Sequence, residues 1–251
     1  MQEFVDFTKQ LATVSGDIIN RYFRSGVNIE TKSDDSPVTI ADKKAEEAMR
    51  ELIMKTFPEH GVIGEEFGNH NEDAEYQWVL DPIDGTKSFI TGTFLFGTLI
   101  GLMKDRNPIL GAIHHSVTSH LLIGTGKETR LNGEIVKVRP TDTLRNSTLL
   151  YTDYNDIGKY QNGIAFQQLT GRTNINRTWG DCHGYFLVAT GYADIMVDPI
   201  MNLWDIVALI PVIEGAGGRI TDWKGNPPLD GSGIIATNGI LHDQVLRALN
   251  P

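Results

Sequence analysis

The spacing of apolar residues changes twice along the chain, and these changes limit the folds that it can adopt. In residues 1–24, apolar side chains recur every three or four positions, which predicts a helix with one buried face. A second helix is predicted over residues 41–57, where Pro58 ends it. Short apolar runs at residues 62–64 and 78–83 then predict strands, and each run ends in carboxylates.

The remaining chain shows two further patterns. Apolar runs joined by short polar turns, including the tight-turn pair Asn132-Gly133, predict antiparallel sheet up to about residue 138. Beyond Pro140 strands alternate with helices. The predicted strands are 148–151, one near 173, 193–197 and 233–236, and the predicted helices are 157–169, 182–190, one from about 204, and 242–249. The fold class expected is α/β, with an α+β half (residues 1–140) before an α/β half (residues 141–251). Without repeats or a long linker, residues 1–251 are expected to form one domain.

Composition excludes several classes of function. The chain has 32 Asp and Glu against 22 Lys and Arg, a net charge of −10, so nucleic acid is not an expected partner. Cys182 is the only cysteine, which excludes an internal disulfide and a cysteine-rich zinc site. The first ten residues lack the features of a secretory signal, and no run approaches the roughly 18 apolar residues of a membrane helix. We therefore expect a soluble, cytoplasmic protein that does not bind membranes.

Three groups of carboxylates mark a candidate metal site. Glu65 and Glu66 follow one predicted strand, Asp81 and Asp84 follow another, and Asp205 begins an otherwise apolar helix. Acids beside apolar runs are partly buried, and buried carboxylates must be paired or bind metal. Oxygen ligands without His or Cys suit Mg²⁺. Taken alone, Glu65 or Asp205 is more often an ordinary turn residue or helix cap.

The sequence Asp84-Gly85-Thr86 adds a candidate phosphate site. Gly85 leaves its backbone amide open to close approach, and a helical turn is predicted to begin at Thr86. Backbone N–H groups at the start of a helix bind phosphate without a basic side chain. Metal-binding carboxylates next to such amides predict metal-assisted hydrolysis of a phosphate ester by water.

At these motifs the chain resembles the inositol monophosphatase family of Mg²⁺-dependent, lithium-sensitive phosphatases. The two signatures of that family match DPIDGT at residues 81–86 and WDIVALIPVIEGAGG at residues 204–218. The GEE motif at residues 64–66 and the segment from Lys32 to Asp42 fit in order. The resemblance covers nearly the whole chain and implies a layered αβαβα sandwich of the inositol monophosphatase and fructose-1,6-bisphosphatase type, as a homodimer.

The resemblance also implies roles for individual residues. Two or three Mg²⁺ ions per site are implied, with ligands at Glu65, Asp81, the carbonyl of Ile83, Asp84 and Asp205. Thr86 and Asp42 match the residues that orient the attacking water, and Glu66 matches a residue that supports the ligands. The phosphate of a small phosphate ester would contact Asp84, Gly85 and Thr86. Lys32 lies where the family has a lysine near the site.

Within the family, three short stretches are similar to histidinol-phosphate phosphatases: residues 81–102, Gly180-Asp181-Cys182 and residues 209–213. Histidinol phosphate carries an ammonium group and an imidazole, and carboxylates at Asp181 and Asp198 would select a cationic substrate. Alternatively, Asp198 precedes Pro199 and only opens a turn. Three functions remain open: a histidinol-phosphatase of histidine biosynthesis, an inositol-1-monophosphatase or broad small-molecule phosphatase, and a catalytically silent relative.

His114 and His115 are not interpreted as a metal-binding pair. Adjacent residues of a strand point to opposite faces of its sheet, so one ring should point inward and the other outward. Cys182 is interpreted as a buried, unreactive thiol at the start of an apolar helix.

Overall fold

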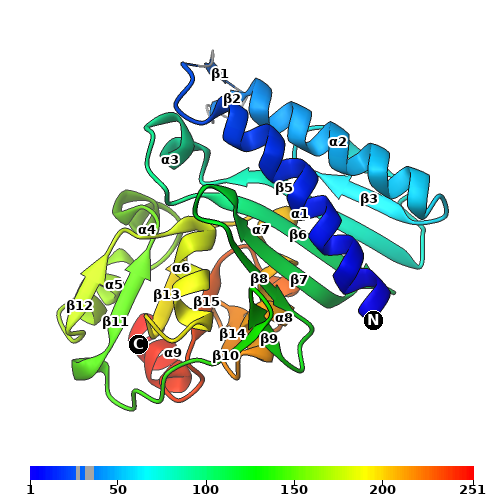
Figure 1. Ribbon diagram of the computed structural model, residues 1–251. Helices are drawn as coiled ribbons and strands as arrows, with labels where there is room; N and C mark the ends of the chain where they lie inside the picture. The colour runs from blue at the N-terminus through cyan, green and yellow to red at the C-terminus, as the bar shows by residue number, and fades with distance from the viewer. Residues whose placement is uncertain (27–28, 32–36) are drawn as a thin grey trace.

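Two β-sheets lie between three layers of helices in an αβαβα order, as the sequence predicted (Figure 1). The structure, a computed structural model, describes residues 1–26, 29–31 and 37–251. Lys32, the residue named above as lying near the site, falls outside the described residues.

The first layer consists of helices α1 (Gln2–Tyr22) and α2 (Ile40–Thr56), which lie side by side on one face of the larger sheet (Figure 1). Both helices were predicted from their apolar spacing. α1 buries Phe7 and Leu11 against Trp78 of the sheet. Thr39 caps α2, and a small antiparallel pair, β1 (Ile29–Thr31) and β2 (Pro37–Thr39), precedes it.

The larger sheet has the strand order β10-β9-β8-β7-β6-β5-β3-β4. Its strands are β3 (Gly61–Gly64), β4 (Gly68–His70), β5 (Tyr76–Asp84), β6 (Gly97–Lys104), β7 (Asn107–His115), β8 (His120–Gly124), β9 (Thr129–Leu131) and β10 (Glu134–Val136). β3 and β5 are parallel, and the other pairs are antiparallel. Asn132 and Gly133 have φ angles of 48° and 93°, which confirms the predicted tight turn between β9 and β10. The short helix α3 (Thr86–Ile90) follows β5.

The smaller sheet has the order β12-β11-β13-β15-β14, with the first three strands parallel and the last two antiparallel to their neighbours. Its strands are β11 (Thr148–Tyr151), β12 (Ile175–Arg177), β13 (Ile195–Asp198), β14 (Arg219–Asp222) and β15 (Ile234–Thr237). Helices α4 (Tyr154–Tyr160), α5 (Gly163–Thr170) and α9 (His242–Leu249) pack around its outer face. Helices α6 (Asp181–Ala189), α7 (Leu203–Ile206) and α8 (Leu209–Gly215) lie between the sheets. Short 3₁₀ turns occur at η1 (Ser116–Thr118), η2 (Leu144–Asn146) and η3 (Pro228–Asp230).

Two predicted helices differ from the structure, and one strand was not predicted. The single helix expected over residues 157–169 is two helices, because the Asn162 side chain accepts a hydrogen bond from the Ala165 amide and starts α5 anew. The helix expected from residue 204 is likewise divided into α7 and α8. Strand β14 was not predicted, because only Ile220 among its four residues is apolar.

Both faces of the larger sheet are covered, and this corrects the prediction for His114 and His115. The two rings do point to opposite faces, but neither faces solvent. The His114 ring packs against Gly16 of α1, and the His115 ring contacts His183 and Phe186 of α6. Helices cover both faces of β7, so His115 is buried and His114 is partly buried.

Candidate active site

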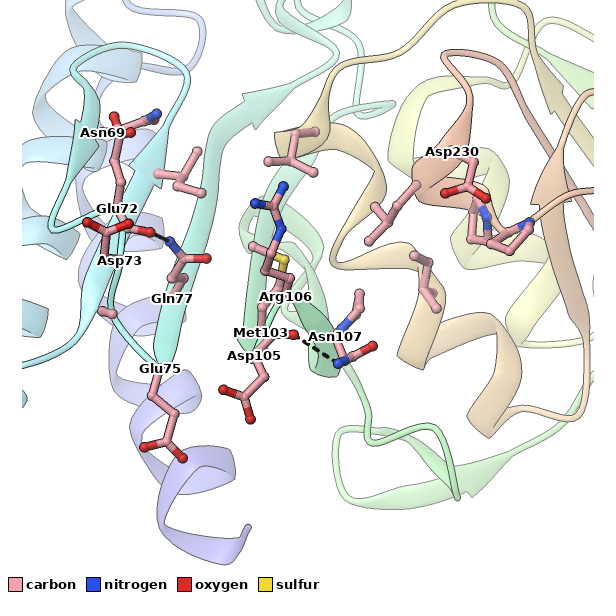
Figure 2. A pocket seen from close by; sticks show the side chains of 18 residues that line it. Asn69, Glu72, Asp73, Glu75, Gln77, Met103, Asp105, Arg106, Asn107 and Asp230 are labelled. Atoms are coloured by element: carbon pink, nitrogen blue, oxygen red, sulfur yellow. Dashed lines mark hydrogen bonds between the residues drawn. The ribbon is translucent and has the colours of Figure 1, made fainter.

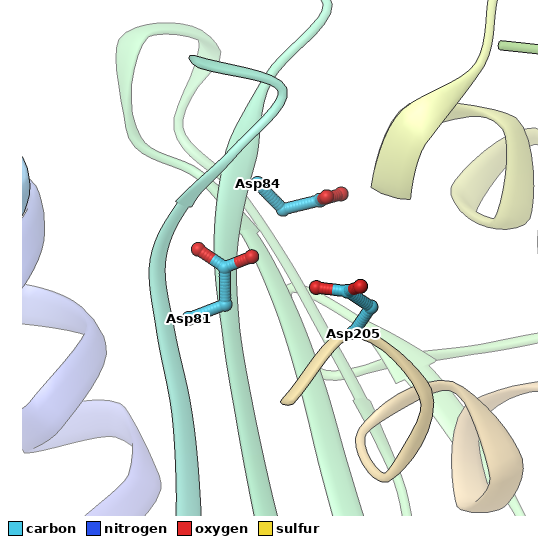
Figure 3. Close-up of side chains that lie close together, drawn as sticks. All are labelled: Asp81, Asp84 and Asp205. Atoms are coloured by element: carbon cyan, nitrogen blue, oxygen red, sulfur yellow. The ribbon is translucent and has the colours of Figure 1, made fainter. Parts of the chain in front are cut away.

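Three carboxylates converge where the two halves of the chain meet. Oxygen atoms of Asp81, Asp84 and Asp205 all lie within 4.8 Å of one another, and their carboxylates face a common space (Figure 3). Asp81 and Asp84 come from the end of β5, and Asp205 comes from α7. Within the described part of the chain, this is the group whose geometry could hold a metal ion. The structure thus brings together three of the residues that the sequence named.

A bulge in β5 explains why Asp81 and Asp84 share one side. In the ladder with β6, Asp81 pairs with Leu99 and Asp84 with Gly97, so three steps on β5 oppose two on β6. Residues three apart on a regular strand point to opposite faces, and one extra residue brings them to the same face. The Thr98 hydroxyl donates to the Pro82 carbonyl at 2.9 Å and holds the bulge in place.

Burial and mutual repulsion raise the pKa values of these acids. Burial is the largest cause for all three, and it raises the pKa of Asp205 to about 7. Burial also raises the pKa of Asp81 and of Asp84 well above the usual range, aided chiefly by the charge of Glu65 for Asp81 and of Asp181 for Asp84. Such a group favours either bound protons or a bound cation.

Glu65 and Glu66 lie in the loop that follows β3. A buried ion pair, which the sequence did not predict, holds this loop in place. The Glu46 carboxylate of α2 accepts hydrogen bonds from the amides of Glu66 (2.8 Å) and Phe67 (3.1 Å), and Arg50 pairs with Glu46 at 2.8 Å. Glu46 is fully buried. The sequence does contain a signal for this ion pair. Glu46 and Arg50 are opposite charges four residues apart on a predicted helix, and Glu46 directly follows the inward-facing Ala45.

The turn after Asp84 depends on a glycine. Gly85 has φ +89°, and a Cβ atom there would lie 2.8 Å from the Leu95 carbonyl oxygen and 3.1 Å from an Asp181 oxygen. The turn leads into α3, where the Thr86 hydroxyl donates to the Ile83 carbonyl at 3.0 Å. The Ile83 amide in turn donates to Asp81 at 3.0 Å. These bonds fix the backbone of the predicted phosphate site.

Asp42 is buried at the start of α2. One of its oxygens accepts hydrogen bonds from the amide and the hydroxyl of Thr39, at 2.9 Å and 2.6 Å. Burial raises the pKa of Asp42 to about 6, against the opposing effect of these bonds. The structure thus gives Asp42 a capping role, and its role with Thr86 in orienting water stays a prediction.

A cavity of about 110 Å³ opens beside Asp84 and Asp205. Asp153, Asp156, Asp181 and Asp198 also line it. Among the described residues that line it, none is Lys or Arg. The cavity therefore suits a substrate whose organic part is polar or cationic.

Asp181 and Asp198 are held by different contacts. The Asp181 amide donates to the Thr152 hydroxyl at 2.8 Å, and its backbone has φ +48°. Burial raises the pKa of Asp181 to about 7, and the nearby Lys87 opposes this rise. Asp198 accepts a hydrogen bond from the Tyr185 hydroxyl at 3.0 Å, and burial raises its pKa to about 6.

A larger cavity of about 990 Å³ lies away from these residues, lined by segments 69–77, 103–108 and 227–230 (Figure 2). In this view Arg106 lies between Gln77 on one side and Asp230 on the other. None of the site residues named from the sequence lines this cavity. Although this cavity is larger, the cavity beside Asp84 and Asp205 is therefore the better candidate for the active site.

No helix in residues 1–26, 29–31 and 37–251 combines the length and the apolar character needed to cross a membrane.

The chain is similar to known proteins along its whole length. Over residues 1–251 the chain matches the inositol monophosphatase family. The chain is 40% identical over 262 residues to the chloroplastic bifunctional phosphatase IMPL2 of Arabidopsis thaliana, covering 99% of this chain and 75% of that protein. It is 36% identical over 243 residues to a histidinol-phosphatase of Chlorobaculum parvum, covering 96% and 94%. A solved inositol monophosphatase from Zymomonas mobilis superposes with a TM-score of 0.88 at 35% identity, covering 100% and 98%. The chain belongs to the inositol monophosphatase family, and it is an enzyme that hydrolyses phosphoric monoesters.

Proposed function

We propose that the chain is a Mg²⁺-dependent histidinol-phosphatase, which converts histidinol phosphate to histidinol and phosphate. The observation that carries the proposal is the convergence of Asp81, Asp84 and Asp205 beside a cavity lined by further acids and by no basic residue among those described. Similarity to named histidinol-phosphatases supports the same substrate.

The donor set fits Mg²⁺. Its members are hard oxygen atoms. Burial, and in second place repulsion between the acids, raises the pKa values of Asp81, Asp84 and Asp205, and a divalent cation would relieve that repulsion. Two or three ions would be held by Glu65, Asp81, the Ile83 carbonyl, Asp84 and Asp205. Bound Mg²⁺ would lower the pKa of the attacking water and stabilise charge on the phosphoryl and leaving oxygens.

The protein groups position the reactants. The Thr86 hydroxyl donates its only proton to Ile83, so its lone pairs can accept a hydrogen bond from the attacking water. Asp42 would orient the same water, and Glu66 would support the ligands through the loop that Glu46 holds. The amides of Gly85 and Thr86, with Asp84, would bind the phosphate.

Asp181 and Asp198 would recognise the organic part of the substrate. Both line the cavity, and they would attract the ammonium group or the imidazole of histidinol phosphate. An inositol phosphate carries no such cation, so it could only donate hydrogen bonds from its hydroxyl groups to these carboxylates. The acidic lining thus favours histidinol phosphate over inositol phosphate.

A phosphate-release screen tests the proposal. Purified protein with Mg²⁺ would be offered histidinol phosphate, inositol 1-phosphate and a set of sugar phosphates at equal concentrations. We expect the highest kcat/KM on histidinol phosphate, loss of activity with a chelator, recovery with Mg²⁺ and inhibition by Ca²⁺, whose looser coordination misplaces water and phosphate. A preference for inositol 1-phosphate would replace the substrate assignment, and full turnover after exhaustive chelation would contradict the metal mechanism. The homodimer and the cytoplasmic location stay predictions, which sedimentation and cell fractionation can check.

A further inference from the structure

Two histidines that have no part in the proposed chemistry contact each other behind the candidate site. His115 ends β7 and is 4% exposed, and His183 lies in the first turn of α6. Nδ1 of His183 lies 3.4 Å from Nε2 of His115. Nδ1 of His115 lies 2.6 Å from the carbonyl oxygen of Phe96. The two rings therefore join α6 to the segment that enters β6.

The chemistry of the partners fixes where the protons lie. A carbonyl oxygen only accepts, so Nδ1 of His115 carries a proton and donates it to Phe96. Burial lowers the pKa of His115 to about 3 and that of His183 to about 4, so both rings are neutral near pH 7. Nε2 of His115 is then an acceptor, and Nδ1 of His183 must be the donor to it.

The Phe96 segment forms one wall of the turn at Gly85. A Cβ atom on Gly85 would lie 2.8 Å from the Leu95 carbonyl oxygen and 3.2 Å from Cα of Phe96. Asp84 also pairs with Gly97 in the ladder between β5 and β6. A shift of the Phe96 backbone would therefore move the turn that carries the phosphate-binding amides.

Helix α6 also contacts this turn directly. The backbone amide of Cys182, next to His183, donates a hydrogen bond to the Asp84 carboxylate. The contacts thus close a ring, from α6 through His183, His115 and Phe96 to Gly85, and back through Asp84 to α6. A closed ring of contacts restricts the turn more than either contact alone.

We propose that His183 and His115 are positioning residues, whose mutual hydrogen bond holds the Phe96 backbone against Gly85 and so sets the position of the phosphate-binding turn. This inference rests on the proposed role of Gly85 and Thr86 in phosphate binding. Neither histidine touches the substrate.

A pair of His183 variants tests the inference. His183→Leu removes the donor, whereas His183→Asn keeps an N–H group near the position of Nδ1. His120→Leu is the matched control, because His120 also packs near Phe186 but has Thr118 as its hydrogen-bond partner. The measurements are kcat and KM on an aryl phosphate with Mg²⁺, inhibition by inorganic phosphate, and the melting temperature.

We expect His183→Leu to raise both KM and the inhibition constant of inorganic phosphate by about three- to tenfold, with a smaller change in kcat. His183→Asn should keep both constants close to their wild-type values, and His120→Leu should leave them unchanged. A lower melting temperature for His183→Leu with wild-type KM and phosphate inhibition would show a merely structural bond and overturn the inference.

Nitrogen-15 NMR of the histidine rings gives a readout that needs no turnover. The wild-type spectrum should show His115 protonated at Nδ1 and His183 protonated at Nδ1, and a proton on Nε2 of His115 would overturn the inference. If the wild-type protein hydrolysed no phosphomonoester and bound no phosphate, the proposed function would be wrong. The phosphate-binding role of the turn at Gly85 would then be wrong too. If activity were normal but the tautomers differed, only the present inference would fail.

Discussion

The backbone amide of Cys182 donates a hydrogen bond to the carboxylate of Asp84, and this bond joins α6 to the end of β5. It crosses between the two halves of the chain, because Asp84 belongs to the larger sheet and Cys182 to the helices between the sheets. The bond favours the ionised form of Asp84 and opposes the effect of burial on its pKa. The bond thereby lowers the free-energy cost of ionising Asp84 when a cation binds.

Neutralising Asp84 or Asp205 should strongly lower activity without unfolding the protein. We expect Asp84→Asn and Asp205→Asn each to lower kcat by about a hundredfold or more, which corresponds to about 2.7 kcal/mol of lost transition-state stabilisation. The metal-free variants should melt at the same or a higher temperature than wild type, because one repelling charge is gone. Asp230→Asn, an exposed acid outside the site, is the control. Near-normal kcat in either site variant at saturating Mg²⁺ would show that its residue is not a ligand.

The stability of the metal-free protein should rise on mild acidification. Burial raises the folded-state pKa of Asp181 and of Asp205 to about 7, above the 3.8 of an unperturbed carboxyl group. As pH falls through about 7, these groups take up protons in the folded state only, so the free energy of unfolding increases. Chemical denaturation between pH 8 and pH 6.5 measures this increase.

Two comparisons identify the source of that increase. Saturating Mg²⁺ and the Asp205→Asn substitution should each reduce it. Below pH 6.5 the buried histidines act in the opposite sense, because burial lowers the folded-state pKa of His242 to about 4 and the unfolded chain takes up the proton first. A metal-free protein whose stability falls steadily from pH 8 to pH 6.5 would contradict the raised pKa values.

Adding one methyl group at Gly85 should damage the site more than the fold. Gly85→Ala and the control Gly126→Ala both place a side chain at positive φ, +89° and +75°, at a cost of about 1–2 kcal/mol each. Only the Gly85 methyl group meets backbone, at 2.8 Å from the Leu95 oxygen, while the Gly126 methyl group meets nothing within 4 Å. We expect both variants to lose stability, Gly85→Ala more because of this contact, and only Gly85→Ala to lose activity on an aryl phosphate. Equal activity of the two variants would remove Gly85 from the phosphate site.

Removing the charge of Asp198 should weaken selection of a cationic substrate. Asp198→Asn keeps an oxygen that can accept the hydrogen bond from Tyr185, so shape and packing are preserved. We expect kcat/KM for histidinol phosphate to fall about tenfold to a hundredfold, since a partly desolvated ionic hydrogen bond contributes about 1.5–3 kcal/mol. Hydrolysis of an uncharged aryl phosphate should hardly change. Equal losses on both substrates would indicate a structural role for Asp198.

The fold could be predicted where its signals are local. The last helix and β11 begin and end where the sequence placed them, because apolar periodicity alone defines them. The acids at the end of β5 were also predictable, since Asp81 and Asp84 belong to the compact motif DPIDGT at residues 81–86. Local patterns did not reveal β14, whose polar residues form a strand only because β15 pairs with them.

The parts of the site that sequence did not predict are contacts between distant segments. Glu46 with Arg50 looks like an ordinary helix-surface pair until the loop after β3 folds over it. His115 and His183 lie in separate elements, and only the packing of α6 against the larger sheet brings their rings together. Such partners depend on tertiary packing, which one sequence without its fold does not specify.

The three acids of the candidate metal site come from both halves of the chain, and this has a consequence during synthesis of the protein. Asp81 and Asp84 leave the ribosome early, while Asp205 lies in the last fifth of the chain. Closing so long a loop is slow and must precede assembly of the three acids. A nascent chain can therefore fold much of its larger sheet while it still lacks a complete cation site. Under the proposed metal mechanism, cation uptake would come at the end of folding, and a ribosome-bound fragment that stops before residue 205 should hydrolyse nothing.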